Sequence, residues 1–339
     1  MKYSLLLILP ALFACKGESK ADLGDIPDDS GTVVEDCDTT LEAFSGMPPT
    51  SSPNDWFYRQ AHILTFSDSN PNLTLTLTDS AGNVEEVDHV WDDARLNATV
   101  LPLDGEWTPG ETHTLTVGFC GNTPSIEFST SDYGMPLDSD SSDLVGKTYF
   151  INLSTADYTE PPGVGSMLGL FLDMPLLLGV ASVEADIINF EAGLGEQHPT
   201  TGEWSTIGEH WIFDGADFSG SPYFSAATPL LDIPYGSVTI PVHDFAITGT
   251  FAADMSAIGF ATFTGLGDTS TMGPLLNLGS DPFALCEFLG DQGIPCADCP
   301  EPNSDSDDDG VADETLQTCI RLTGEITSAD QLLGVNIIE

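Results

Sequence analysis

Hydrophobic and polar residues alternate with a period of two in much of the chain between residues 45 and 133. Leucine alternates with threonine in Asn72–Asp79, and Leu115, Val117 and Phe119 fall on one side of Thr112–Cys120. Alternation of this kind predicts strands that bury one face. Turn residues separate the segments at intervals of about 8–12 residues, which is typical of a β-sandwich. Further strands are predicted at His62–Phe66, Val84–Trp91, Ala98–Leu101 and Ser125–Thr130.

Residues 146–339 continue this β-rich pattern and add the signals of one short helix. Asp281 can cap that helix, Pro282 suits its first position and Gly290 can close it. We expect a mainly β protein with a β-sandwich at 45–133, a larger β-rich barrel or sandwich with minor helix at 146–339, and an acidic linker at 134–145 between them. Strands of the second region are predicted at Gly146–Leu153, Ser182–Phe190, Glu209–Phe213, Ser237–His243, Phe245–Thr250, Ile258–Thr264 and Thr318–Ile326.

The most apolar stretch after residue 15 is Pro161–Val180. Asp173, Pro175 and several glycines argue against a membrane span, which would need an uninterrupted apolar helix. Two interpretations remain. The segment is either a buried, kinked helical crossover or the lid or lining of a cavity for an apolar ligand.

Residues 1–14 combine Lys2 with a short apolar run and end at Ala14, the pattern of a secretory signal peptide. The run is shorter than the ~20 residues that a membrane span needs. The sequence Leu12–Cys15 resembles the lipobox of bacterial lipoproteins. This resemblance implies that Cys15 becomes the first mature residue and carries a lipid that attaches it to a membrane. Because Lys16 is not the aspartate that often retains such lipoproteins at the inner membrane, we expect attachment at the outer membrane or cell surface.

The charge balance limits the classes of partner. The chain has 7 Lys and Arg against 54 Asp and Glu, a formal net charge of −47. This balance excludes nucleic acid, because phosphate binding needs basic side chains. Charge of this size repels itself unless ions screen it, so we expect saline or divalent-rich surroundings. Residues 15–44 are acidic and poor in large apolar residues, and we expect them to form a solvated tether.

Seven cysteines, less the lipidated Cys15, leave an even number for disulfide bonds. Cys37 and Cys120 lie in the first half of the chain, and we expect them to form one bridge. Two more bridges are expected among the last four cysteines, for which three pairings are possible. These four are Cys286, Cys296, Cys299 and Cys319.

Three segments of the first region, Ile63–Ser67, Trp107–Val117 and Ile126–Thr130, resemble strands of the bacterial Ig-like domain of S-layer and surface proteins. The resemblance implies an Ig-like β-sandwich that acts as a spacer or binding module. It implies no catalytic residues. The histidines of this region, His62 and His113 among them, have no metal-ligand spacing and are predicted to be ordinary strand residues.

The second region resembles uncharacterised predicted lipoproteins of myxobacteria and their relatives. That resemblance implies the same envelope location and supplies no established activity. The matching features are Gly146–Tyr149, Leu177–Val180, Ile247–Phe251 and the cysteines Cys296, Cys299 and Cys319.

The acidic loop Asp305–Glu314 has the spacing of a calcium-binding loop. Its pattern resembles the calcium loops of thrombospondin type 3 repeats and dockerins. Position 12 of the loop is Leu316, where an EF-hand has a bidentate glutamate. The alternatives are structural calcium binding and a solvated acidic loop. The candidate calcium ligands are Asp305, Asp307, Asp309, the backbone carbonyl of Val311, and Asp313.

The sequence contains no nucleophile elbow, zinc-protease, P-loop or dinucleotide-binding motif, so no catalytic residue is predicted. Apart from possible structural calcium, no cofactor is expected. We predict a non-enzymatic cell-envelope lipoprotein with an interaction or structural role, whose partners are the membrane and an envelope protein. The alternative is a carrier of an apolar ligand or lipid, with a cavity in the second β region.

Overall fold

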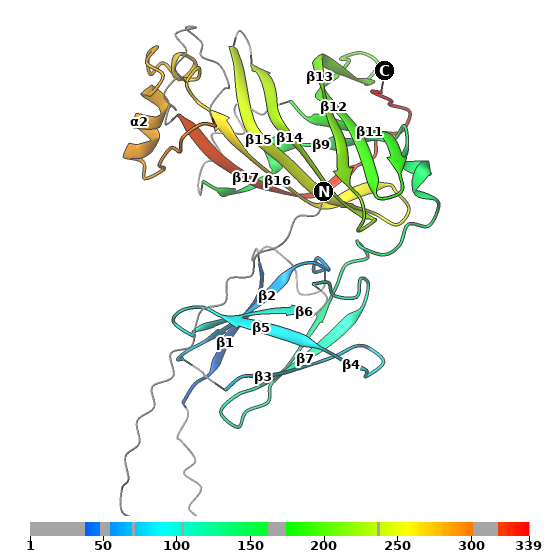
Figure 1. Cartoon of the computed structure of the whole chain (residues 1–339), viewed down its shortest axis with the longest axis vertical. Helices are drawn as coiled ribbons and strands as arrows, with labels where there is room; N and C mark the ends of the chain where they lie inside the picture. Colours follow the sequence, from blue (N-terminus) through cyan, green and yellow to red (C-terminus); the bar gives the residue numbers. More distant parts are fainter. Residues whose placement is uncertain are drawn as a thin grey trace, which may run out of the picture. The chain divides into compact units, whose positions relative to one another are not determined.

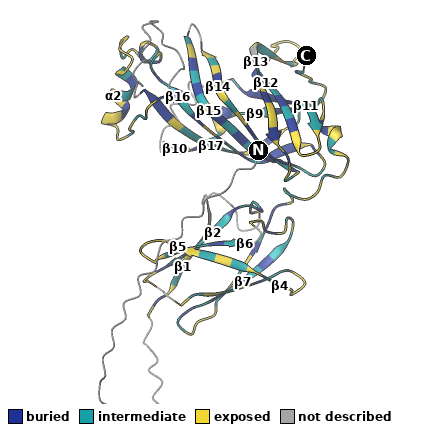
Figure 2. Cartoon of the chain, in the orientation of Figure 1, coloured by how far each residue is buried: buried dark blue, intermediate teal, exposed yellow. Residues whose placement is uncertain are grey.

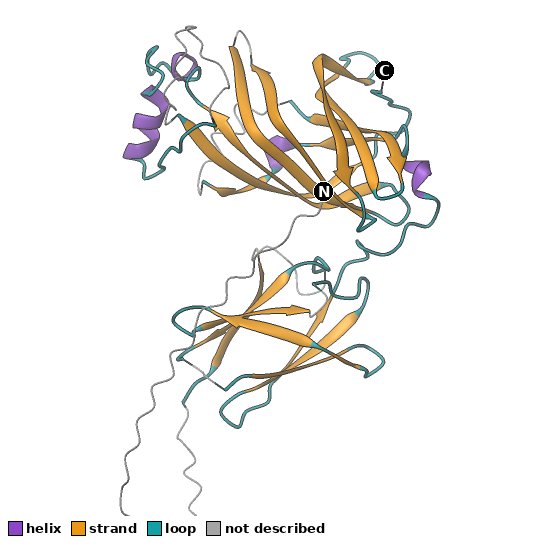
Figure 3. Cartoon of the chain, viewed as in Figure 1, coloured by secondary structure: helices purple, strands orange, loops and turns teal. Residues whose placement is uncertain are grey.

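The computed structural model describes residues 38–47, 55–69, 72–102, 105–161, 174–235, 238–300 and 318–338. Residues Thr39–Glu339 belong to one compact unit. Strands make up most of the described residues, and the helices are short (Figures 1 and 3). The prediction of a mainly β protein is therefore confirmed.

The first β region consists of two four-stranded antiparallel sheets, with orders β1-β2-β6-β5 and β4-β3-β7-β8. Strand β1 begins at Leu41, so the tether predicted for residues 15–44 ends too late. Leu41 and Phe44 pack against the core between the sheets, which explains why they join the fold. The strands are β1 (Leu41–Met47), β2 (Ala61–Phe66), β3 (Thr74–Thr78), β4 (Val84–Glu85), β5 (Val87–Trp91), β6 (Asn97–Pro102), β7 (Thr112–Gly118) and β8 (Ser125–Ser129).

Burial follows the alternation in the sequence. In β7, Leu115 and Val117 are buried and their chain neighbours are half-buried, and β2 repeats this pattern with Leu64 and Phe66 (Figure 2). Each buried side chain of this size contributes about 1.5–3 kcal/mol to folding. The inward faces of both sheets share one core, as expected for a β-sandwich.

The second β region is built on one nine-stranded antiparallel sheet, with order β10-β17-β16-β15-β14-β13-β12-β11-β9. Its largest core contains phenylalanines from several strands, including Phe190, Phe213 and Phe251. The strands are β9 (Thr148–Ile151), β10 (Asp157–Glu160), β11 (Leu176–Glu184), β12 (Ile187–Gln197), β13 (Trp204–Asp217), β14 (Tyr223–Tyr235), β15 (Val238–Phe251), β16 (Ala257–Asp268) and β17 (Cys319–Asp330).

This sheet is not a closed barrel. Of the two architectures predicted for the second region, the barrel is therefore wrong. Strand β9 meets the chain just after β17 through an isolated bridge between Tyr149 and Gln331. Strands β13 and β14 pair in register only at Asp217 and Ser225, near one end of each strand. The other parts of β13 and β14 have no registered pairing with each other.

Several predicted strands differ from those observed. Ser182–Phe190 was predicted as one strand, but it contains a hairpin turn in which Ala185 has a φ of 51°. The two strands predicted on either side of Asp244 are one long strand, β15, and Asp244 adopts a φ of 49° within it. A short alternating pattern does not distinguish a tight turn from a bulge, because both interrupt the period for only one or two residues.

Strand β14 was not predicted at all. It contains Pro229 and Pro234, and proline lacks the N–H that a central strand uses for pairing. These prolines are tolerated because this part of β14 pairs with β15 on one side and has no registered partner in β13 on the other. The tertiary arrangement therefore overrides the sequence signal.

The short helices are η1 (Ser141–Leu144), η2 (Leu153–Thr155), η3 (Gly273–Leu276) and α2 (Ala284–Asp291). Helix α2 forms near its predicted position, but it begins and ends later in the sequence than predicted. Its N-cap is Phe283 rather than Asp281, whose carboxylate accepts a hydrogen bond from the Phe283 N–H at 2.9 Å. Gly290 lies inside the helix, and the C-cap is Gln292.

The described part of the apolar stretch Pro161–Val180 is not helical. Leu176–Val180 begin strand β11 and are buried; this strand is second from one edge of the sheet, paired with β12 on one side and β9 on the other. Residues 162–173 lie outside the described residues. Among the described residues, no helix has the length and hydropathy required to cross a membrane.

The segment predicted as an acidic linker, residues 134–145, contacts the second β region. Leu144 is fully buried, and Leu137 packs against the same core. The Asp138 N–H donates to the backbone carbonyl of Ala253 at 2.8 Å. Leu137 and Leu144 therefore attach this acidic segment to a hydrophobic core.

Candidate functional site

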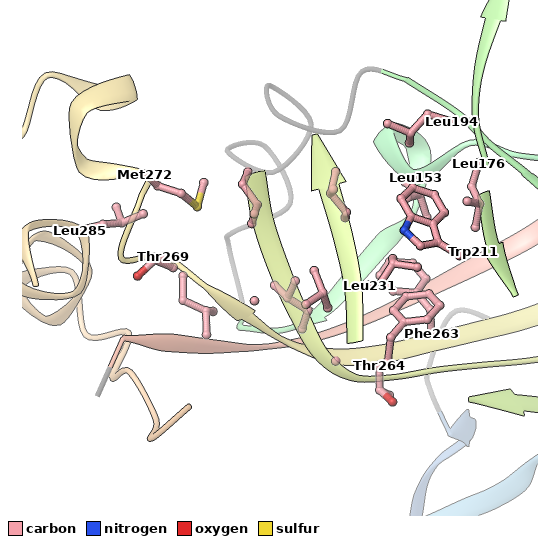
Figure 4. Close-up of a pocket in the computed structure, with 18 residues that line it drawn as sticks. Leu153, Leu176, Leu194, Trp211, Leu231, Phe263, Thr264, Thr269, Met272 and Leu285 are labelled. Atoms are coloured by element: carbon pink, nitrogen blue, oxygen red, sulfur yellow. The ribbon is translucent and has the colours of Figure 1, made fainter. Parts of the chain in front are cut away.

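A cavity of about 70 Å³ lies in the second β region (Figure 4). Its lining extends from Met272 and Leu285 at one end to Leu194 and Trp211 at the other. The full lining is Leu153, Leu176, Leu194, Trp211, Leu231, Ile233, Ile240, Val242, Phe245, Phe263, Thr264, Gly265, Gly267, Thr269, Met272, Leu285, Ile320 and Leu322.

The sheet topology explains where this cavity forms. Leu231 and Ile233 come from β14, and Trp211 comes from β13. These strands share only one registered pair, so their side chains are not held together by a continuous ladder. Side chains on paired strands lie close enough to interdigitate. Where two strands separate, their apolar side chains pack less closely, and a cavity can remain between them.

The surface of the cavity is apolar. The lining contains no charged side chain, and Thr264 and Thr269 are its hydroxyl residues. The Thr269 hydroxyl donates to the backbone carbonyl of Thr318 at 2.6 Å, so its hydrogen-bonding need is already met. A ligand here is held by shape and apolar contact, without directed polar recognition.

A small disulfide-linked cluster covers the α2 end of the cavity. Leu285 and Leu289 of α2 are buried together with Met272, Ile240 and Ile320. Cys286 and Cys296 form one disulfide bond. Met272 is the most adaptable residue of this wall, because its unbranched side chain has three rotatable bonds.

The last four cysteines form two bridges, the number expected. Of the three possible pairings, the structure contains Cys286–Cys296 and Cys299–Cys319. The second bridge links the loop after α2 to the first residue of β17. Sequence spacing could not select this pairing, because it depends on where the loop folds back onto the sheet.

The other predicted site residues lie mostly outside the described residues. Cys120 is disulfide-bonded, while its predicted partner Cys37 and the predicted lipidation site Cys15 fall outside the described ranges. The predicted calcium ligands also lie outside them, namely Asp305, Asp307, Asp309, Val311 and Asp313. Within the described ranges, no group of three or more His, Cys, Asp or Glu side chains could hold a metal ion.

Two histidines of the first region lie inside the sandwich core, where both rings pack against Phe128. His62 and His113 are fully buried, and the ring of His62 lies 3.7 Å from the ring of Trp56 between centroids. Neither ring nitrogen of His62 has a hydrogen-bond partner among the described residues. Burial, together with the nearby His113, lowers the pKa of His62 to about 2. His62 is therefore a neutral core residue of the sandwich.

The lining of the cavity was missed at the sequence level. Only Leu176 belongs to the segment that was predicted to line a cavity, Pro161–Val180. Trp211 falls in a predicted strand, Glu209–Phe213, whereas Leu231 falls in a segment where no strand was predicted. No local signal separates a residue that fills a core from one that lines a cavity, since both are apolar.

Comparison with known proteins gives no relative: no protein-family model matches the chain, and neither a curated protein nor a solved structure matches it. The resemblances found in the sequence therefore stay predictions. The observations that bear on function are the geometry of the second β region and the N-terminal motif.

Proposed function

We propose that this chain is a lipid-anchored protein of the cell envelope whose second β region carries an apolar ligand. The carbon-lined cavity beside the separation of β13 and β14 carries this proposal. The signal-peptide pattern and the lipobox ending at Cys15 support the location at the outer membrane or cell surface. Low basic content supports a partner other than nucleic acid.

The size of the cavity limits the ligand. An engineered cavity of about 150 Å³ is known to hold benzene, whereas this cavity measures about 70 Å³. A thin hydrocarbon chain therefore fits better than a ring, and a longer chain requires side chains such as Met272 to move. We infer a ligand with an unbranched alkyl or acyl chain.

A structural or interaction role is the second candidate function. Large, separate hydrophobic cores fill both β regions, and disulfides reinforce the second. Such a protein would need no ligand, and its cavity would be a minor packing defect. An exported protein that holds a partner in the envelope is consistent with the same N-terminal motif.

Native mass spectrometry of the mature chain, purified from an oxidising compartment, tests the carrier proposal. We expect a bound mass in the range of a lipid, and displacement of an apolar fluorescent probe by a long-chain fatty acid. The variant Val242→Phe narrows the cavity and should weaken probe binding by about tenfold or more, since a bulky side chain displaces the ligand.

Two further variants keep this test decisive. Leu322→Phe narrows the cavity from another strand, in case Val242→Phe fails to fold. Val84→Phe is the matched control, because Val84 is 71% exposed in the first region. A protein without bound mass, whose probe binding is unchanged by both cavity variants, would leave the structural role as the better proposal.

A further inference from the structure

Three polar side chains form a hydrogen-bonded chain on β12 and β13, which lie side by side in the sheet (Figure 1). The Nδ1 atom of His210 bonds to the Glu191 carboxylate, and Nε2 lies 2.6 Å from the Thr206 hydroxyl oxygen. The His210 and Glu191 side chains are only 17% and 16% exposed. These hydrogen-bonded side chains are therefore largely buried, but solvent can still reach them.

The chemistry of the partners sets the direction of these bonds. An ionised carboxylate can only accept, so Glu191 holds the proton on Nδ1 of His210. The lone pair on Nε2 then accepts the hydroxyl proton of Thr206. This order of hydroxyl, imidazole and carboxylate is the one in which histidine serves as a general base for a hydroxyl nucleophile.

A bulge in β13 brings His210 toward Thr206. Ala192 of β12 pairs with Trp211, and Leu194 pairs with Ile207, so a single residue of β12 faces residues 208–210. Gly208 has a φ of 77° at this bulge. Such bulges redirect side chains, and they are over-represented next to active sites.

The residue of β12 opposite the bulge is Gly193. The space that its missing side chain leaves is occupied by the side chains of Thr206 and His210. A Cβ atom on Gly193 would lie 2.9 Å from Cγ2 of Thr206 and 3.2 Å from Cδ2 of His210. Any larger residue would push these two side chains. Glycine therefore permits the close approach of hydroxyl and imidazole to the backbone of β12.

Thr206 and His210 line a groove of about 330 Å³. They lie on the face of the sheet opposite the apolar cavity, because His210 directly precedes Trp211, which lines that cavity. Residues 334–338 form another wall, where Asn336 accepts a hydrogen bond from the Ile338 N–H at 3.0 Å through its Oδ1 atom. This bond uses only the Oδ1 atom of Asn336, so its amide NH₂ can donate to a ligand.

We propose that Thr206, His210 and Glu191 form an acyl-transfer site that hydrolyses a neutral carboxylic ester with a small apolar acyl group. Trp204, Val335 and Ile337 supply apolar surface for that group. A net charge of −47 repels anionic substrates, which is why a neutral ester is favoured. The proposal does not depend on ligand binding in the cavity.

The reaction takes two balanced steps. The Thr206 oxygen bonds to the ester carbonyl carbon, its proton passes to Nε2 of His210, and the alcohol leaves with that proton as the C–O bond breaks. Water then attacks the acyl-threonine and gives its proton to Nε2. The carboxylic acid leaves as the proton returns to the Thr206 oxygen. Glu191 stabilises the imidazolium formed in each step, and Asn336, which lines the same groove, supplies a side-chain amide donor for the oxyanion.

Hydrolysis of p-nitrophenyl acetate and butyrate by the full mature chain tests the proposal. Thr206→Val keeps the shape of the side chain without its hydroxyl, and His210→Gln removes the base. We expect each to lower kcat/KM by about 100-fold or more. We also expect intact-mass spectrometry to find a single acetyl group on Thr206 of the wild type after brief exposure to the acetate ester.

His198→Gln is the matched control for reaction of the ester with a surface imidazole, since His198 is exposed and lies outside the groove. It should retain the wild-type rate. The positioning variant Gly193→Ala should lower kcat with little change in KM and with the pH dependence of the rate retained. Thermal unfolding of every variant verifies that it is folded.

Clear results would overturn the proposal. Wild-type hydrolysis no faster than that of the Thr206→Val and His210→Gln variants would show that the three side chains serve only structure. The same conclusion holds if the acetyl group is found elsewhere than on Thr206. Either outcome leaves the carrier proposal untouched, because the cavity lies on the other face of the sheet.

Discussion

At the residue scale, the least expected feature is a histidine enclosed by aromatic rings. His62 packs against Trp56, Trp107 and Phe128 in the sandwich core. Burying two ring nitrogens without hydrogen bonds costs free energy, and the cost rises steeply if the ring is protonated. The first region therefore carries a built-in sensitivity to acid.

We predict that the first region loses stability as the pH falls below the ordinary histidine value. The pKa of His62 is lowered from 6.5 to about 2 in the folded chain. Below pH 6.5 the unfolded chain binds a proton that the folded chain does not. Each further pH unit then lowers the free energy of unfolding by about 1.4 kcal/mol, until the folded pKa is reached.

Thermal unfolding of wild type and His62→Phe between pH 7 and pH 4 measures this effect. The aromatic variant should lose less stability over that range, because its ring cannot take up a proton. His89→Gln is the control, since His89 is only partly buried. Equal acid sensitivity in wild type and His62→Phe would show that other groups, not His62, set the pH dependence.

At the element scale, two irregularities in the second sheet carry the proposed functions. The incomplete pairing of β13 and β14 leaves room for the apolar cavity, and the bulge opposite Gly193 brings Thr206 to His210. Helix α2 has eight residues, too few to be stable alone in water. Its position depends on burial of Leu285 and Leu289 and on the disulfide at Cys286.

We predict that the double variant Cys286→Ser, Cys296→Ser loosens the wall of the cavity. Removing a bridge over a short loop costs about 2–3 kcal/mol, chiefly because the unfolded chain gains freedom. Leu285 lines the cavity, so bound apolar probe should also dissociate faster. Urea unfolding and stopped-flow probe release measure the two effects. A variant that unfolds like wild type and keeps the probe as long would show that packing alone holds α2.

At the scale of the whole molecule, charge is the dominant feature. With 54 acidic and 7 basic side chains, most carboxylates cannot pair with a cation of the same chain. Some find other partners. Hydrogen bonds from Asn83 lower the pKa of Asp79, and those from Asn97 do the same for Asp92. Such bonds stabilise single carboxylates but do not remove the repulsion among them.

We predict that the melting temperature rises as sodium chloride is increased from 0.01 M to 1 M, because the screening length falls from about 30 Å to about 3 Å. Calcium chloride at matched ionic strength tests the acidic loop separately. If Asp305, Asp307 and Asp309 hold calcium, this salt should stabilise the wild type further, and Asp309→Asn should lose that extra effect. A melting temperature independent of salt would mean that the carboxylates lie too far apart to repel strongly.

The sequence alone determined the mainly β composition, the positions of β2, β3, β6, β7 and β8 in the first region, and the number of bridges among the last four cysteines. It did not predict β1, and it predicted β4 and β5 as one strand, Val84–Trp91, although they belong to different sheets. Alternation suffices for the strands, because the two faces of a strand meet different surroundings. The tertiary structure decided the rest. It tolerated Pro229 and Pro234 in β14, selected the disulfide pairing, left the cavity and brought Glu191, Thr206 and His210 together. Each of these depends on which strands lie side by side and where their pairing is broken, and the order of residues along one strand does not record that.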